Sequence, residues 1–196
     1  MIDMWAFVLA VVALLAVPGP TNTLLAASGA AIGPRPSLPL IPAEIAGYLV
    51  AMGILLAAIE PLARAYPAVM VGAKLAAAAY LAWTAVQLWR GGSAELMAVP
   101  APASPARVFL TTLLNPKALI FASVIFPRDG LTSLVVHAAV FTALVAAISA
   151  GWIGLGNVIS HAAAGAATPQ RVLGVGAVAL AVFATLIARS AVASLL

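Results

Sequence analysis

The stretch Val17-Pro18-Gly19-Pro20-Thr21-Asn22 interrupts an apolar run that extends from Met4 to Ala27. Proline has no N–H, and its ring clashes with the carbonyl four residues earlier in a helix. The carbonyls of Leu14 and Ala16 are therefore expected to lose their helical partners. In lipid, such groups cost several kcal/mol unless protein, water or a ligand satisfies them. The stretch predicts a helix that is broken near the middle of a membrane.

A second interruption, Asn115-Pro116-Lys117, lies inside the apolar run from Val108 to Phe126. By the same reasoning, the carbonyl of Thr112 is expected to lose its helical partner. A lone proline in a membrane helix commonly does no more than kink it. Two interruptions with polar neighbours, at comparable depth in the two halves of the chain, favour a functional role instead.

The composition requires a bilayer. Of 196 residues, 65% are hydrophobic and 7% are charged, and the mean hydropathy is +1.18, whereas about 25% of a soluble domain is charged. The net charge of +4 comes from basic residues scattered singly near the ends of the apolar segments, which is ordinary at a membrane surface and argues against nucleic-acid binding. The absence of cysteine excludes disulfides and thiolate catalysis.

Apolar length and helix breakers predict six spans. They lie at 4–27, 38–59, 67–89, 106–127, 131–160 and 171–190. The first run has Asp3 in its flank and is long enough to span, so it is expected to be retained as a helix and not cleaved as a signal.

The glycine- and proline-rich interval 91–105 divides the chain into halves, at about 1–96 and 104–196, and each half begins with its broken span. Three spans per half force the second half to start on the opposite side of the membrane, which gives inverted-topology repeats. We therefore predict one transmembrane transporter domain, an all-α integral membrane protein with six helices in two inverted three-helix repeats, whose first and fourth helices are broken.

A broken helix offers two kinds of group at mid-membrane depth. Free carbonyls can accept hydrogen bonds from an ammonium group, and the start of the next half-helix presents N–H donors to a carboxylate. A zwitterion needs both within a few Å, so an amino acid is a natural ligand. The residues expected to line the site are Pro18, Gly19, Pro20, Thr21, Asn22, Asn115, Pro116 and Lys117, with Thr112 lending its carbonyl.

Away from the ends of the predicted spans, three charged residues lie inside them: Glu44, Lys74 and Lys117. Lys117 is about 16 Å deep at about 1.5 Å per residue, and a cation at that depth costs at least about 2.5–3.5 kcal/mol. It is expected to bind substrate, and a buried ion pair or a cap on broken-helix carbonyls would also explain it. Glu44 could pair with Lys117, exchange protons, or be an interfacial acid. Lys74 could take part in coupling or reach the nearer membrane face with its side chain.

Neither a metal site nor an enzyme active site is predicted. His137 and His161 are 24 residues apart without acidic or thiol companions, which is not metal-ligand spacing. They are expected to be hydrogen-bonded or interfacial. No nucleophile and acid–base set can be assembled from the remaining polar residues, so the chain is predicted not to be an enzyme and to need no cofactor.

With Pro-Gly-Pro in its first span and Asn-Pro-Lys in its fourth, the chain resembles the LysE/RhtB superfamily of amino-acid exporters. The stretches Val17–Asn22 and Leu114–Ala118 carry the resemblance, together with Lys74–Arg90 and the segment from Gly174 onward, so that it covers the whole chain. The superfamily usually has Asp or Asn directly after Pro-Gly-Pro, where this chain has Thr21. The resemblance implies proton-driven efflux of an amino acid or similar small solute across the inner membrane of a bacterial cell.

Other readings of the sequence stay open. A divalent metal cation could be the cargo of the same fold, although soft ligands are scarce, and a helper subunit without transport would have the same composition. Small-residue faces such as Gly72 and Ala76, with the resemblance, lead us to expect a homodimer. Arginines near the predicted loops, four on one side and three on the other, favour both termini outside.

Overall fold

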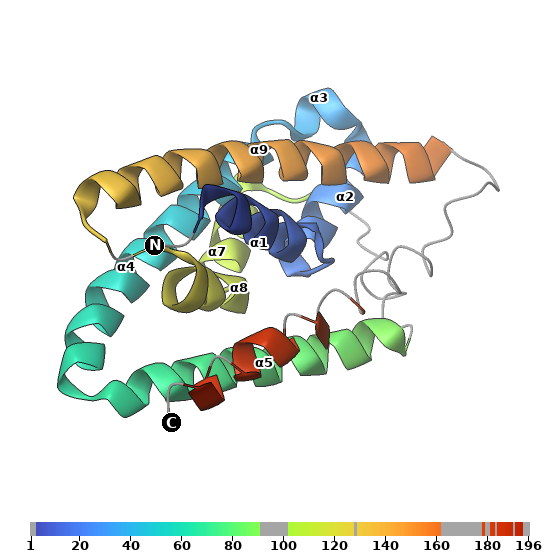
Figure 1. Cartoon of the computed structure of the whole chain (residues 1–196). Coiled ribbons are helices and arrows are strands. Elements are labelled where there is room, and N and C mark those ends of the chain that lie inside the picture. The colour runs from blue at the N-terminus through green and yellow to red at the C-terminus, as the bar shows by residue number, and fades with distance from the viewer. Residues whose placement is uncertain are drawn as a thin grey trace.

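The computed structural model describes residues 3–90, 102–127 and 129–161, and near the C-terminus residues 178, 181–182, 184–189 and 191–193. The regular elements of this part of the chain are helices, shown in Figure 1. They follow one another as α1 (Met4–Ala16), α2 (Pro20–Ile32), α3 (Pro34–Ser37), α4 (Leu40–Ala65), α5 (Pro67–Trp89), α7 (Pro105–Leu113), α8 (Pro116–Ile120), the π-helical turn η1 (Phe121–Ile125) and α9 (Leu131–His161).

Both predicted breaks are present. The axes of α1 and α2 differ by 63°, and the axis of α7 differs by 46° from that of α8 with η1. Pro20 and Pro116 each occupy the first turn of the helix that follows, where the missing N–H costs nothing because that position has no intrahelical partner. Val17 adopts an extended conformation, which ends α1 and redirects the chain.

The candidate spans agree with the prediction in part. Pro34–Ala58 and Leu131–His161 are each long and apolar enough to cross a membrane, and counting each bent pair as one span brings the number to as many as four. α9 is continuous over the predicted fifth span, through Gly151, Gly154 and Gly156. The predicted third span forms α5, with the same bounds. Much of the predicted sixth span, 171–190, lies outside the described residues.

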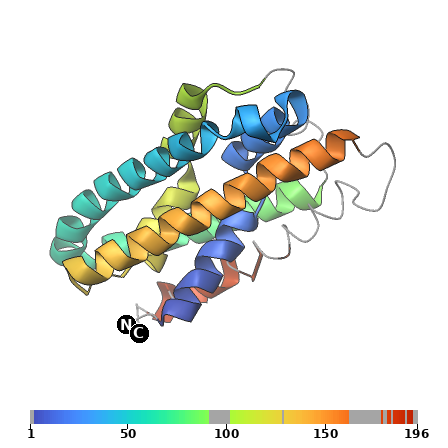
Figure 2. The same ribbon diagram turned by 90° about the horizontal axis from the view of Figure 1, so that it is seen from above.

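The helices enclose an interior that both breaks enter. Figure 1 shows α9 along one edge and α5 along the opposite edge, with α1, α7 and α8 between them, and Figure 2 shows the same arrangement from above. The α2 and α9 backbones nearly touch where they cross. A Cβ on Gly29 would overlap the Ile153 carbonyl, and one on Gly156 would overlap the Ala26 carbonyl, so this crossing requires glycine.

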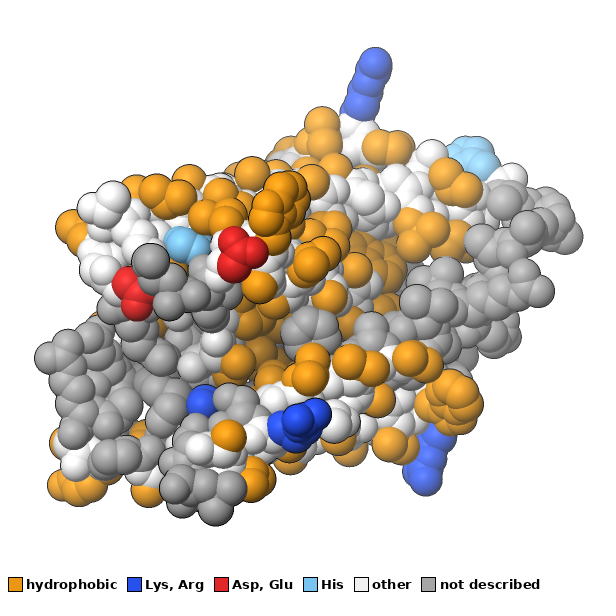
Figure 3. All heavy atoms as spheres, in the orientation of Figure 1, with side chains coloured by type: hydrophobic (Ala, Val, Ile, Leu, Met, Phe, Trp, Pro, Cys, Tyr) orange, Lys and Arg blue, Asp and Glu red, His pale blue; other side chains and the backbone are white. Residues whose placement is uncertain are grey.

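The apolar side chains divide between an aromatic core and an apolar outer surface. Phe7, Tyr48, Phe121, Phe126 and Phe141 are buried and make edge-to-face ring contacts. Large apolar side chains such as Trp5, Leu9 and Trp89 are 68–75% exposed, and hydrophobic atoms spread over much of the face in Figure 3. An outer surface of this kind suits contact with lipid.

Candidate functional site

At the first break, Asn22 supplies the missing hydrogen bonds. Its side-chain amide donates to the carbonyls of Leu15 and Val17, each at 2.7 Å, and the side chain is buried. The loss of partners expected for the Leu14 and Ala16 carbonyls stays a prediction. The bend brings the amide to the neighbouring carbonyls, because Asn22 lies in the first turn of α2 and faces the end of α1. One NH₂ group has two N–H donors, so it can serve both carbonyls.

At the second break, Asn115 is the N-cap of α8, and its side-chain oxygen accepts from the Lys117 backbone N–H at 3.0 Å. The Thr112 carbonyl was expected to be free, but it accepts from the Asn115 backbone N–H at 3.0 Å. The chain tightens here into a turn, so the lost α-helical partner is replaced locally. Thr112 faces the other break with its hydroxyl and not with its carbonyl.

The two breaks meet through a directed chain of hydrogen bonds. Thr112 Oγ1 donates to the Val108 carbonyl at 2.8 Å, so its single hydrogen is used. It therefore accepts from Thr21 Oγ1, at 3.2 Å, and Thr21 in turn accepts from the Asn115 side-chain amide, also at 3.2 Å. These buried contacts join residues 91 and 94 positions apart, and they bring Thr21, Thr112 and Asn115 together as predicted.

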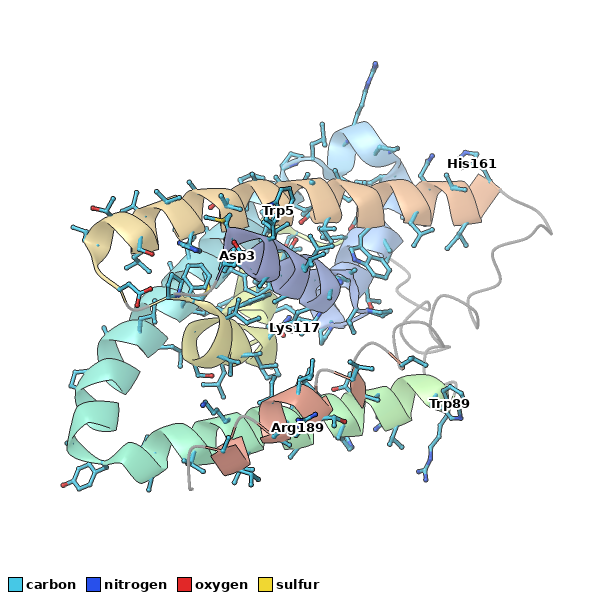
Figure 4. All side chains as sticks on the ribbon, in the orientation of Figure 1. Asp3, Trp5, Trp89, Lys117, His161 and Arg189 are labelled. Carbon is cyan, nitrogen blue, oxygen red and sulfur yellow. The ribbon has the colours of Figure 1, made fainter. Side chains whose placement is uncertain are left out.

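Lys117 reaches from the second break into the first. Its ammonium donates to the Val17 carbonyl at 2.6 Å, and the side chain is 4% exposed. A Cβ added to Gly19 would lie 3.4 Å from Lys117 Nζ, which is van der Waals contact, so the ammonium lies directly beside Gly19. Figure 4 shows Lys117 in the interior, beside α1. The lysine thus caps a carbonyl of the broken helix at the negative end of the α1 dipole.

The start of α2 is suited to an anion. Gly19 is its N-cap and supplies no side-chain acceptor to the first turn, and Pro20 follows. The N–H groups of a first helical turn have no intrahelical acceptor and carry the positive end of the helix dipole. Here Thr21 and Asn22 of that turn are buried, at most 3% exposed, and the Lys117 ammonium lies next to Gly19 at its start. Uncapped N–H donors and a cation therefore adjoin in the interior.

Glu44 provides a negative charge in the same interior. It is 1% exposed on α4. The Ser149 Oγ of α9 lies 2.5 Å from Glu44 Oε2 and 2.5 Å from the Val145 carbonyl, so its one hydroxyl hydrogen is shared between these two acceptors. The carboxylate also interacts electrostatically with Lys117. Glu44 is therefore a buried residue of α4 and not an interfacial acid. Lys74 is half-buried on α5, and the hydrogen bonds that join the two breaks come from other residues.

Sequence reasoning did not identify two residues of this interior. Ser149 lies 105 positions from Glu44, and no local pattern in the sequence indicates the pairing. Tyr48 is fully buried on α4, one helical turn after Glu44, and the i, i+4 spacing could have identified it. The histidines agree with expectation, because His137 Nδ1 lies 2.7 Å from the Ser133 carbonyl and the exposed His161 Nδ1 lies 2.7 Å from the Asn157 carbonyl.

Broken helices whose ends face each other around buried charges, in a helical protein with an apolar exterior, are typical of membrane transporters. The family model of the LysE type translocator matches residues 12–191, so the chain belongs to this family. The match confirms the resemblance that the two proline motifs indicated. It is a family of translocators and not of enzymes, as predicted.

The chain is also 30% identical over 129 residues to an uncharacterized membrane protein of Pseudomonas aeruginosa. The aligned region covers 61% of this chain and 60% of that protein, so the chain spans 60% of the length of this curated relative. No solved structure matches the chain. The relative and the family match agree that this is a membrane protein.

Proposed function

We propose that the protein is a secondary-active exporter of an amino acid or a similar small zwitterionic metabolite, coupled to protons, in the inner membrane of a bacterial cell. The observation that carries the proposal is the Lys117 ammonium beside the first turn of α2, which has no side-chain cap and in which Thr21 and Asn22 are buried. A carboxylate bound there would accept hydrogen bonds from both. Charge-assisted hydrogen bonds of this kind are about twice as strong as neutral ones.

Lys117 can bind a substrate carboxylate without leaving the Val17 carbonyl unsatisfied. In the described structure, Lys117 Nζ donates to the Val17 carbonyl. An ammonium has three N–H donors, so Lys117 can keep Val17 while it takes a substrate carboxylate. If the lysine moves away, the Val17 carbonyl still has the Asn22 amide at 2.7 Å. The Val17 carbonyl is therefore hydrogen-bonded whether Lys117 stays or moves away. This suits a site that binds and releases substrate repeatedly.

The architecture supports alternating access. Each half begins with a broken helix, and a long helix follows the break in each half, α4 in the first and α9 in the second. We propose six spans in two inverted repeats, with the substrate held where the breaks meet and the halves moving against each other around it. The orientation with both termini outside and the homodimer stay predictions from the sequence, which C-terminal topology tags and a native mass measurement test.

Glu44 is the proposed coupling residue. Coupling to protons requires a group whose charge changes as the site turns from one side to the other. Glu44 is buried, bonds Ser149 across the interior and shares an electrostatic interaction with Lys117. Protonation of the carboxylate would remove the negative charge that Lys117 experiences, so proton binding and substrate binding would influence each other.

Transport by the purified protein in liposomes tests the proposal. With an imposed pH gradient and a panel of labelled amino acids, we expect gradient-driven movement of at least one amino acid. We expect Lys117→Ala to insert and remain stable in detergent but not to transport. Movement of cadmium or another divalent cation in place of amino acids would favour the metal-exporter alternative. Movement of neither would favour a helper subunit, and unchanged transport by Lys117→Ala would remove the central claim.

A further inference from the structure

The Tyr48 hydroxyl has no hydrogen-bond partner within the described part of the chain, although the residue is 0% exposed. Buried hydroxyl groups in proteins nearly always have a partner, because leaving one unsatisfied forfeits the hydrogen bonds it made in water. A tyrosine in a purely structural position could be phenylalanine without this cost. The hydroxyl therefore calls for a partner that the described residues do not provide.

The ring of Tyr48 is held firmly in place. It packs edge-to-face against Phe121 of η1, with centroids 5.6 Å apart, and against Phe141 of α9, with centroids 5.7 Å apart. Phe121 and Phe141 also pack against each other at 4.9 Å. Because aromatic neighbours on two elements fix the ring, the hydroxyl cannot swing out to find a partner elsewhere, and its position is preorganised.

The position of Tyr48 on α4 relates it to Glu44. The two residues are four positions apart on α4, which puts them on one face of the helix, and they interact electrostatically. Glu44 Oε2 accepts from Ser149, and a carboxylate has further lone pairs to offer. The same face of α4 thus carries a phenolic oxygen and a carboxylate, both of which can accept hydrogen bonds, and Glu44 also interacts electrostatically with Lys117.

We propose that Tyr48 and Glu44 together form the subsite for the positively charged amino group of the transported molecule. An ammonium has three N–H donors and needs oxygen acceptors when it leaves water. This inference rests on the proposed function, which assigns the substrate carboxylate to Lys117 and the start of α2. A zwitterion would then lie with its negative end at the breaks and its positive end at α4, so that each charge meets its opposite.

The test compares Tyr48→Phe with Tyr66→Phe, a matched change at a tyrosine that is 63% exposed. Purified proteins in detergent are titrated with an equimolar mixture of the twenty amino acids, and separately with the N-acetylated mixture, while the melting temperature is followed. We expect the amino acids to stabilise the wild type and the acetylated mixture, which lacks the ammonium, to stabilise it less. Tyr48→Phe should need about tenfold more amino acid for the same shift, and Tyr66→Phe should match the wild type.

The ligand-free melting temperature separates binding from packing. Because Tyr48→Phe keeps the ring and removes an unpartnered hydroxyl, its ligand-free protein should melt at or above the wild-type temperature. Wild-type affinity in Tyr48→Phe would mean that the hydroxyl holds an ordered water only, and it would overturn the subsite. A fall in ligand-free stability that accounts for the weaker binding would overturn it as well. No stabilisation of the wild type by amino acids would instead overturn the proposed function, and the subsite with it.

Discussion

Replacement of Lys117 by methionine tests the site most directly, because it removes the charge and keeps most of the side-chain volume. Hydrogen bonds to charged groups contribute about 1.5–3 kcal/mol. At about 1.4 kcal/mol per factor of ten, losing one such bond to the substrate carboxylate lowers affinity by about 10- to 150-fold. Transport at low substrate concentration should fall by the same factor or more.

The stability of Lys117→Met should change much less than its transport. Removing a buried cation relieves its desolvation cost, while losing the electrostatic interaction with Glu44 acts in the opposite direction. The Val17 carbonyl keeps the Asn22 amide at 2.7 Å, so it is not left unsatisfied. We expect the two opposing effects to leave the free energy of unfolding within about 2 kcal/mol of the wild type.

The assay pairs two measurements on the same preparations. Uptake or efflux of labelled amino acids is followed in liposomes under an imposed pH gradient, and the melting temperature is measured in detergent. Arg35→Met is the matched control, since Arg35 is exposed on α3. Wild-type transport by Lys117→Met would refute the reasoning. A loss of transport that parallels a collapse in melting temperature would assign Lys117 to structure alone.

Three further predictions follow from the packing and the polar interior. Gly156→Ala should destabilise the protein by about 1–3 kcal/mol, because its Cβ would overlap a backbone carbonyl of α2, whereas Gly151→Ala, which faces open space, should be tolerated; melting temperatures decide. Asn22→Leu should cost about 1–3 kcal/mol by leaving two carbonyls of the first break without this donor, and equal denaturation curves for variant and wild type would contradict that role. Glu44→Gln should keep its fold, because an amide oxygen can still accept from Ser149. This variant should lose proton-driven accumulation of substrate but retain substrate counterflow. Accumulation at the wild-type level would show that Glu44 is not the coupling residue.

Local sequence patterns predicted those parts of the fold that depend on local chemistry. Pro18 and Pro20 end one helix and start the next wherever they occur in an apolar run, and Pro116 does the same. The breaks and the bounds of α5 and α9 could therefore be read from the sequence. The need for glycine at position 156 of α9 could not, because it comes from close packing against α2, which local propensity does not report.

The candidate site was predicted as a set of residues but not as a set of contacts. Asn22, Thr112 and Lys117 were all expected near the breaks. The sequence did not indicate that Asn22 bonds the carbonyls of Leu15 and Val17, since the 63° bend decides which carbonyls a side chain can reach. It also missed Ser149 as the partner of Glu44, because that contact depends on how α4 and α9 pack.

By itself, the sequence determined that the protein needs a bilayer, that two of its helices are broken, and that Lys117 must be paired or used. These follow from backbone hydrogen bonding and from the cost of burying charge, which act at each position separately. Only the tertiary structure decided that the Lys117 ammonium meets the Val17 carbonyl, 100 positions away, and that the Tyr48 hydroxyl has no partner within the described residues. Contacts between distant segments depend on how the helices cross, and the spacing of residues along the chain does not predict those crossings.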